Sequence, residues 1–363
     1  MQLSAVEKKD IDYILKNTES EFKILEGKTV LITGAGGFLG YYFIKSMLSW
    51  NDSHKEKIQL IINSRFSNGM PKWLKEVKKR NDVEIIKKDV TTLKPKDTTQ
   101  IDYIIHAASI ASPIVYRKYP LETMHANVQG LTNLLEYARR RSNTKNPVEG
   151  ILYFSSSEIY GDPTPENIPT PETYRGNVSC TGPRACYDES KRYCETLCVN
   201  YSTVYNLPIK VARPFNNYGP GLKISDGRVI PDFANNILHN ENIIMFSDGA
   251  PQRTFCYIAD AITGYFKVLV AGKPGEAFNI GVEKPEISIR ELAELMVSIA
   301  QKKYDYKGKV IIKASSDKQY LTDNPNRRQP IIKKAKKDIG YNPTITLHEG
   351  LTRSMEWYSD ILS

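Results

Sequence analysis

A glycine-rich loop between an apolar strand and a helix constrains this chain more than any other feature. Residues 28–33 form a compact β-branched run, residues 34–40 carry glycines at positions 34, 37 and 40, and an apolar helical pattern covers residues 41–50. Such glycines permit a tight turn, a close approach of the backbone to a pyrophosphate and close helix–strand packing. Free N–H groups at the start of the helix favour the anion. The pattern predicts a dinucleotide site with candidate residues Gly34, Gly37, Phe38, Leu39 and Gly40.

Apolar runs and helical patterns alternate along the following part of the chain. Helical periodicity is clearest at residues 123–140 and 187–205. Strands that lack polar alternation and are separated by helices are typical of a parallel sheet covered on both faces. We therefore predict an α/β fold with a Rossmann-type, doubly wound parallel sheet. The candidate strands after the first are residues 58–62, 83–86, 103–106, 151–154 and 209–212.

The length and the change in texture along the chain indicate two domains. The 363 residues correspond to two domains at about 150 residues each, and loops rich in Asn, Gly and Pro begin at residue 214. We expect an N-terminal extension, residues 1–27, to form a short polar helix. The predicted dinucleotide-binding domain is 28–213, with 255–282 returning to it through a helix at 254–270 and a strand at 277–280. The predicted smaller C-terminal α/β substrate domain is 214–254 and 283–363, with 286–301 and 317–363 as its later parts.

Charge and apolar content exclude several classes of function. Fifty Lys and Arg against 41 Asp and Glu give a net charge of +9. The basic run at 75–88 also contains acidic and apolar residues, and the run at 333–337 contains an apolar one, which is typical of a solvated helix face and not of a nucleic-acid site. A basic protein does suit a small polyanionic substrate. No run approaches the roughly 20 apolar residues that span a bilayer, and the charged N-terminus is unlike a signal peptide, so we expect a cytoplasmic protein without a membrane or nucleic-acid partner.

Cysteine and histidine usage gives no sign of a disulfide framework or a metal site. The five cysteines are odd in number and lack CxxC spacing, which indicates reduced thiols. The histidines share no ligand spacing, so we predict no metal. His106, at the end of a predicted strand, is interpreted as a structural histidine in preference to a catalytic base.

The second predicted strand leaves the choice between NAD and NADP open. An NAD site usually has an acid at the end of this strand to bind the ribose hydroxyls, but the strand here ends in Asn63 and Arg65. Asn63 can still bond a hydroxyl, whereas Arg65 could meet a 2′-phosphate. We favour NAD, with NADP as the alternative. Asp89 is a candidate contact for the adenine edge, and Val90 and Ala107 complete the predicted cofactor contacts.

A tyrosine and a lysine four positions apart predict a catalytic pair. Tyr187 and Lys191 lie on one face of the predicted helix. The ammonium of Lys191, together with a positive nicotinamide, would favour the phenolate and lower the pKa of Tyr187 from about 10. Tyr187 could then remove a sugar hydroxyl proton while hydride leaves for the cofactor. We expect both residues to contact the cofactor as well.

These motifs, joined to residues 155–161, resemble the extended short-chain dehydrogenase/reductase family that acts on nucleotide sugars. The resemblance covers nearly all of residues 28–360, and within the family it is nearest to the UDP-glucuronate decarboxylases, or UDP-xylose synthases. The segments that carry it are 106–113, 155–161, 182–192, 213–220, 253–257 and 327–330.

The resemblance implies the roles of particular residues. The implied catalytic residues are Ser156, Glu158, Tyr187, Lys191 and Arg328. The implied nucleotide-sugar contacts are Ser112, Asn216, Arg228, Arg253 and Arg328. A homodimer with a four-helix interface is also implied. Decarboxylases of this family usually carry an acid, a proline and a glycine at the positions occupied here by Asn63, Ile110 and Ser190.

The expected reaction is decarboxylation of a nucleotide-linked uronic acid, through oxidation at C4, loss of CO2 and possible reduction of the ketone. The rivals are a 4,6-dehydratase acting on a nucleotide hexose, a C4 epimerase and a non-catalytic sugar-nucleotide binder. The dehydratase pattern has adjacent Asp and Glu, but Ser157 occupies the aspartate position here. The nucleotide base and the fate of the 4-keto product stay open.

Overall fold

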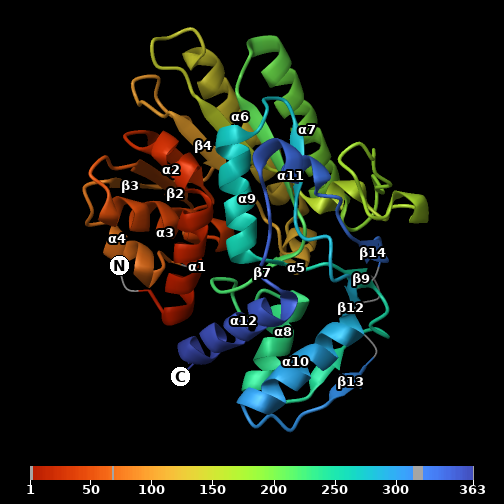
Figure 1. Cartoon of the computed structure of the whole chain (residues 1–363). Coiled ribbons are helices and arrows are strands. Elements are labelled where there is room, and N and C mark those ends of the chain that lie inside the picture. Colours follow the sequence, from red (N-terminus) through yellow and green to blue (C-terminus); the bar gives the residue numbers. More distant parts are fainter. Residues whose placement is uncertain (1–2, 68, 314–321, 363) are drawn as a thin grey trace.

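A seven-stranded parallel sheet forms the centre of the molecule (Figure 1). The computed structural model describes residues 3–67, 69–313 and 322–362. The sheet has the order β11-β6-β5-β4-β1-β2-β3, and every neighbouring pair is parallel. This arrangement confirms the predicted doubly wound sheet. Its strands are β1 Thr29–Thr33, β2 Gln59–Ser64, β3 Val83–Lys87, β4 Tyr103–His106, β5 Gly150–Phe154, β6 Ile209–Pro214 and β11 Ala277–Ile280.

Helices cover both faces of this sheet and create two apolar layers. The helices α3 (Phe38–Ser53) and α9 (Ile258–Ala271) belong to one layer, and α6 (Pro120–Arg141) and α7 (Ala185–Tyr205) belong to the other. Successive side chains of a strand point to opposite faces. Accordingly, Ile32 of β1 packs in the layer of α3 and α9, whereas its neighbour Leu31 packs in the layer of α6 and α7.

The smaller region lies below the sheet in Figure 1 and contains short strands and helices. The short strand β9 pairs with both β12 and β14, and β8 pairs with β13. Of two further helices, α4 (Lys72–Val77) contributes Leu74 and Val77 to the layer of α3 and α9, and α5 (Pro113–Lys118) contacts α6 and α7. The elements of this region are α8 Val229–Leu238, β8 Ile243–Met245, β9 Gln252–Arg253, β12 Ile287–Ser288, α10 Ile289–Lys303, β13 Val310–Ile312, β14 Arg327–Arg328 and α12 Leu347–Leu362. The helix α11 (Lys333–Ile339) instead packs on α9 and on the sheet strand β11.

Two predicted segments begin differently from the expectation. The helix predicted at 254–270 starts at Ile258, because Cys256–Tyr257 form the short strand β10, which pairs with β7 (Asn217–Tyr218). The segment predicted at 286–301 contains β12 before α10, and Ser288 caps that helix. Within the predicted segment 317–363, residues 317–321 lie outside the described residues.

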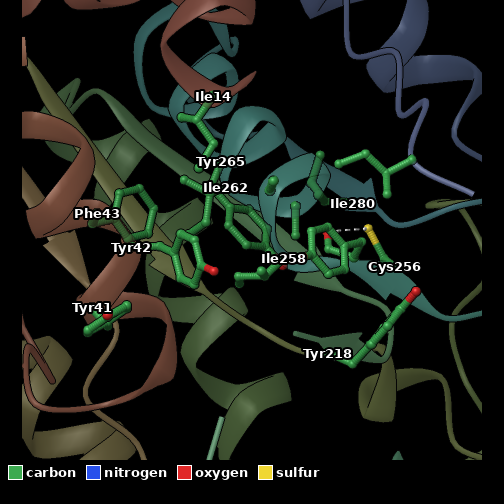
Figure 2. Packing of buried hydrophobic residues seen from close by; sticks show 14 of the residues in the cluster. Ile14, Tyr41, Tyr42, Phe43, Tyr218, Cys256, Ile258, Ile262, Tyr265 and Ile280 are labelled. Carbon is green, nitrogen blue, oxygen red and sulfur yellow. Dashed lines mark hydrogen bonds between the residues drawn. The ribbon is translucent and has the colours of Figure 1, made fainter. Parts of the chain in front are cut away.

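The N-terminal extension is two packed helices and not the single short polar helix that the sequence predicts. The helices are α1 (Ala5–Asn17) and α2 (Glu19–Leu25). Ile14 of α1 and Phe22 of α2 are fully buried in the main apolar layer. Figure 2 shows Ile14 pointing toward Tyr265 and Ile262 of α9. The extension is therefore part of the core. Among the described residues, no helix combines the length and apolar character that a bilayer span requires.

Candidate active site

The glycine loop lies at the carboxyl end of β1, between β2 and β4. Gly34 has a φ of +71°, and a Cβ there would lie 2.6 Å from the carbonyl carbon and oxygen of Ala107. A Cβ on Gly40 would lie 2.6 Å from the Cα of Ala35. Gly37 is the N-cap of α3, so the free N–H groups of that helix begin at this loop. Only glycine fits at Gly34 and Gly40, and this narrow cradle at a helix N-terminus fits a dinucleotide pyrophosphate.

Asn63 links two neighbouring strands at the predicted ribose end of the cofactor site. Its side chain is buried, and its amide donates hydrogen bonds to the carbonyl oxygens of Ile86 (3.2 Å) and Lys88 (3.0 Å). These bonds tie β2 to the end of β3. The amide protons of Asn63 are thus directed to the backbone and not to a ribose hydroxyl.

Arg65 and Asp89, the two charged residues predicted at this end, lie close to each other. Nη1 of Arg65 is 3.6 Å from Oδ2 of Asp89. The backbone N–H and the hydroxyl of Thr91 donate to Oδ1 of Asp89. Burial opposes ionisation of Asp89, but these bonds and Arg65 outweigh it and lower the pKa of the carboxyl. Val90, which follows β3, is buried against Gly130 of α6, and the N–H of Ala107 donates to the carbonyl oxygen of Thr33 at the end of β1.

Tyr187 and Lys191 come together on the first turns of α7, as predicted. The ammonium of Lys191 donates a 2.7 Å hydrogen bond to the carbonyl oxygen of Phe154 and lies 5.6 Å from the centre of the Tyr187 ring. Burial lowers the pKa of Lys191 to about 8. Burial also raises the pKa of Tyr187 to about 12, opposed by a hydrogen bond with Ser156 and by the charge of Arg228. The protein alone thus shifts the pKa of Tyr187 upward, opposite to the direction expected from Lys191 and a bound nicotinamide.

Glu158 is held by arginines next to this pair. It lies in the short 3-10 helix Ser157–Tyr160 that follows β5, and its N–H donates to the hydroxyl of Ser156 (3.2 Å). Nη2 of Arg328 donates to Oε2 of Glu158 at 2.5 Å, and Nη2 of Arg184 donates to the same oxygen. Burial opposes ionisation, but the charges of Arg184, Arg328 and Arg253 outweigh it and lower the pKa of Glu158 to about 2. Glu158 is therefore a carboxylate at neutral pH.

Arg184 and Asp188 belong to this cluster although sequence reasoning did not select them. Arg184 is the N-cap residue of α7, and its Nε lies 3.5 Å from Oδ2 of Asp188. Burial and the nearby charge of Glu158 raise the pKa of Asp188 to about 7. The sequence signal was present, because an arginine and an aspartate four positions apart face each other on a helix.

Two of the predicted substrate contacts, Ser112 and Arg228, meet at Asp226, whereas a third, Asn216, bonds to Thr254. The hydroxyl of Ser112 donates to the carbonyl oxygen of Asp226 (3.2 Å), and Nε of Arg228 lies 2.8 Å from Oδ1 of the same residue, so Ser112 and Arg228 are brought together. Asn216, with a φ of +42°, donates from its amide to the carbonyl oxygen of Thr254 (2.8 Å).

Arg253 is buried and connects two segments of the smaller region through hydrogen bonds. Its guanidinium donates to the carbonyl oxygens of Gln252 (2.7 Å), Pro325 (2.5 Å) and Asn326 (3.1 Å). These bonds fix β9 to the chain that enters β14. Arg253 therefore acts on Glu158 through its charge.

Two further positions bear on questions raised by the sequence. Ser190, one of the positions where the sequence departs from the pattern expected by resemblance, donates to the carbonyl oxygen of Tyr187 (3.0 Å) and accepts from the amide of Asn127 (2.8 Å), so the serine connects α6 to α7. His106 is buried with its Nδ1 2.8 Å from the hydroxyl of Thr33, and burial lowers its pKa to about 3, so the ring is neutral; its Nε2 has no hydrogen-bond partner among the described residues, and a structural role stays a prediction. No group of His, Cys, Asp and Glu within the described ranges could hold a metal ion.

Comparisons with known proteins place the chain in a family. Residues 30–281 match the NAD dependent epimerase/dehydratase family. UDP-glucuronic acid decarboxylase 6 of Arabidopsis thaliana is 35% identical over 322 residues, which are 89% of this chain and 86% of that protein.

Two solved structures share the fold. UDP-glucose 4-epimerase of Thermotoga maritima with UDP-glucose gives a TM-score of 0.77 at 20% identity, over 92% of this chain and 100% of the other. UDP-glucuronic acid 4-epimerase of Bacillus cereus, in complex with UDP-glucuronic acid and NAD, gives 0.72 at 23% identity, over 92% and 99%. With the glycine loop, the Tyr187–Lys191 pair and these matches together, the chain belongs to the NAD dependent epimerase/dehydratase family, the extended short-chain dehydrogenases/reductases.

Proposed function

We propose that this protein is an NAD-dependent decarboxylase that converts UDP-glucuronate to UDP-xylose or to its 4-keto pentose. The observation that carries the proposal is the ionised Glu158, bound by Arg184 and Arg328 and bonded to Ser156 beside Tyr187. The 35% identity to a UDP-glucuronic acid decarboxylase over most of both chains supports the same reaction.

The side chains around Tyr187 fit proton removal from a sugar hydroxyl. Ser156 and Tyr187 share a hydrogen bond, so the proton of the C4 hydroxyl can pass into this pair. Lys191 stabilises negative charge on the phenol oxygen, and its bond to Phe154 fixes its position. NAD, held by the cradle of Gly34 and Gly40, would supply the hydride acceptor for C4.

Loss of CO2 follows from the chemistry of the oxidised sugar. A ketone at C4 is β to the C6 carboxylate, so the C5–C6 bond breaks and its electrons move onto the C4 oxygen. The protonated Ser156 and Tyr187 pair can donate to that oxygen. A proton must then reach C5. The resemblance to the family implies that Arg328 assists delivery of this proton and that Glu158 helps to order the sugar ring and water. Return of hydride to C4 would give the pentose.

The charge of Glu158 argues against the dehydratase rival. A 4,6-dehydratase must protonate a departing C6 hydroxyl, and the family pattern assigns an adjacent Asp and Glu to the two proton transfers. Ser157 is a poor acid, and a Glu158 with a pKa of about 2 carries no proton to give at neutral pH. A C4 epimerase requires no carboxylate between two arginines.

A panel of nucleotide sugars, followed by mass spectrometry, tests the proposal. Purified protein with NAD is incubated with UDP-glucuronate, UDP-glucose and dTDP-glucose. We expect CO2 loss from the uronate, strongly impaired in Glu158→Ala and Arg328→Ala. Loss of water from a hexose, with the uronate unchanged, would favour the dehydratase. Isomerisation at constant mass would favour the epimerase, and binding without conversion would favour the non-catalytic reading.

We also propose that the protein is a homodimer that pairs α6 and α7 with the same helices of a second copy. These two helices pack side by side (Figure 1). Their exposed apolar side chains include Leu121, Met124, Tyr193, Val199 and Val204, and a contiguous apolar helical face is typical of a subunit interface. Light scattering of the wild type and of Leu121→Asp tests this: the wild type should be a dimer and the variant a monomer.

A further inference from the structure

The arginine cluster around Glu158 carries more positive than negative charge. Arg184, Arg253 and Arg328 all act on Glu158. The second acid, Asp188, is only partly ionised at neutral pH, because burial and Glu158 raise its pKa to about 7. Buried charge that lacks a partner is costly. This surplus fits a site that an anionic group of a ligand completes.

The hydrogen bonds of the cluster are also incomplete. Arg184 and Arg328 each use Nη2 for the same oxygen of Glu158. Nε of Arg328, Oδ1 of Asp188 and the hydroxyl of Tyr116 are buried without a hydrogen-bond partner among the described residues, and Nε of Arg184 has only its 3.5 Å contact with Oδ2 of Asp188. Unpaired groups of this kind are rare in proteins and call for an explanation. The side chains of Arg184 and Arg328 are 11% and 9% exposed, so a ligand can reach their outer edges.

The position of Arg184 relates it directly to the catalytic tyrosine. Its guanidinium lies 5.9 Å from the ring centre of Tyr116, and the Tyr116 ring stacks on Tyr187 with centroids 5.1 Å apart and an angle of 13°. The backbone N–H of Glu158 donates to the hydroxyl of Ser156. Because C4 and C5 of the sugar are bonded to each other, a sugar whose C4 hydroxyl lies at Tyr187 and Ser156 places the substituent of C5 near this pair, where Arg184 can reach it.

We propose that Arg184, together with Arg328, binds the C6 carboxylate of the sugar and thereby selects a uronate over a hexose or pentose. The inference rests on the proposed function and adds a specificity residue to it. Guanidinium groups match carboxylates in shape and charge and present several N–H donors. Glu158 occupies one donor of each arginine, so the substrate carboxylate would share the pair with Glu158. Asp188 can hold a proton while the second carboxylate is present, which limits the repulsion.

The same contacts also fit a second role for Arg184, in which it positions Glu158 and does not touch the substrate. The two roles predict different binding. A positioning residue affects turnover and binds all sugar nucleotides alike. A carboxylate-binding residue affects the uronate alone, since UDP-xylose lacks C6 and UDP-glucose has a neutral hydroxymethyl group there.

The test measures binding by calorimetry in the full chain with NAD bound. Tyr187→Phe is the parent, so that substrate is not converted, and Arg184→Gln, Arg184→Lys and the control Arg192→Gln are added to it. Arg192 lies on the same helix and donates to the carbonyl oxygens of Ile159 and Arg175. Each protein is titrated with UDP-glucuronate, UDP-xylose and UDP-glucose.

In Arg184→Gln we expect the affinity for UDP-glucuronate to fall about 10- to 100-fold, as for loss of a charged hydrogen bond. UDP-xylose should bind as it does to the parent, which also shows that the variant is folded. Arg184→Lys should recover part of the loss, and Arg192→Gln should match the parent. An unchanged preference for the uronate, or an equal loss for all three ligands, would overturn the inference, and CO2 formation by the wild type would leave the proposed function standing. A parent without any preference for the uronate would overturn both.

Discussion

Asp10 in the first helix accepts a hydrogen bond of 2.7 Å from Nη1 of Arg353 in the last helix, although 343 positions separate them. The hydroxyls of Tyr42 (2.9 Å) and Tyr257 (2.8 Å) donate to its other oxygen. Asp10 is fully buried, so one carboxylate joins the N-terminal extension, α3 of the dinucleotide-binding half and α12 of the smaller region. Through Asp10, the N-terminal extension thus connects the dinucleotide-binding half to the smaller region.

Removal of the hydrogen bonds of Asp10 should destabilise the protein. Asp10→Ala leaves two buried hydroxyls and Nη1 of Arg353 without their acceptor, while Nη2 of Arg353 keeps its bond to Glu349, so we expect a loss of about 3 kcal/mol in the free energy of unfolding. Urea denaturation at neutral pH measures it. Asp12→Ala, an exposed position on the same helix, should change stability by less than about 0.5 kcal/mol. Equal stability of the two variants would show that Asp10 does not join the halves.

Tyr187 should be essential for turnover but not for binding. Tyr187→Phe removes the hydroxyl that takes the C4 proton, so turnover should fall by at least about 10²- to 10⁴-fold. Calorimetry should show that UDP-glucuronate still binds. Tyr193→Phe, which alters an exposed tyrosine on the same helix, provides the matched control. Near-normal turnover of Tyr187→Phe would remove this residue from the mechanism.

The pH dependence of turnover should report Lys191. Burial lowers the pKa of this lysine from 10.5 to about 8, so the ammonium loses its proton at lower pH than an exposed lysine does. Because the ammonium stabilises the Tyr187 phenolate, turnover should decline as pH rises through about 8. Lys191→Arg keeps a charge throughout this range, and in this variant the decline near that pH should disappear. A wild-type profile that keeps rising to pH 10 would contradict the role of Lys191.

The sequence predicted the sheet well because buried parallel strands and the glycine loop have strong local signals. It also predicted Tyr187 and Lys191, whose spacing alone places them on one face. It did not predict the packing of α1 and α2, because their apolar residues are few and gain meaning only against α9. Arg184 and Asp188 were missed for a similar reason: their effect depends on Glu158, which reaches them from a different element. The sequence also did not predict that the amide nitrogen of Asn63 bonds to the neighbouring strand, and a contact of Asn63 with the ribose stays a prediction.

The cofactor should be NAD. Arg65, the residue that could bind a 2′-phosphate, lies 3.6 Å from Asp89, whose negative charge would repel that phosphate. Denaturing the purified protein and identifying the released nucleotide by mass spectrometry tests the choice. We expect NAD from the wild type and from Arg65→Ala. Recovery of NADP from the wild type, and its loss in Arg65→Ala, would show that Arg65 reads the phosphate.

The central claim is that the C6 carboxylate leaves the sugar as CO2. UDP-glucuronate labelled with heavy carbon at C6 is incubated with the wild-type protein and NAD, and the gas and the nucleotide product are analysed by mass spectrometry. We predict labelled CO2 together with an unlabelled UDP-linked pentose or 4-keto pentose. Tyr187→Phe should form these products only at the strongly reduced rate that remains without the tyrosine hydroxyl. Retention of the label in the nucleotide sugar after prolonged incubation, with or without epimerisation at C4, would contradict the claim.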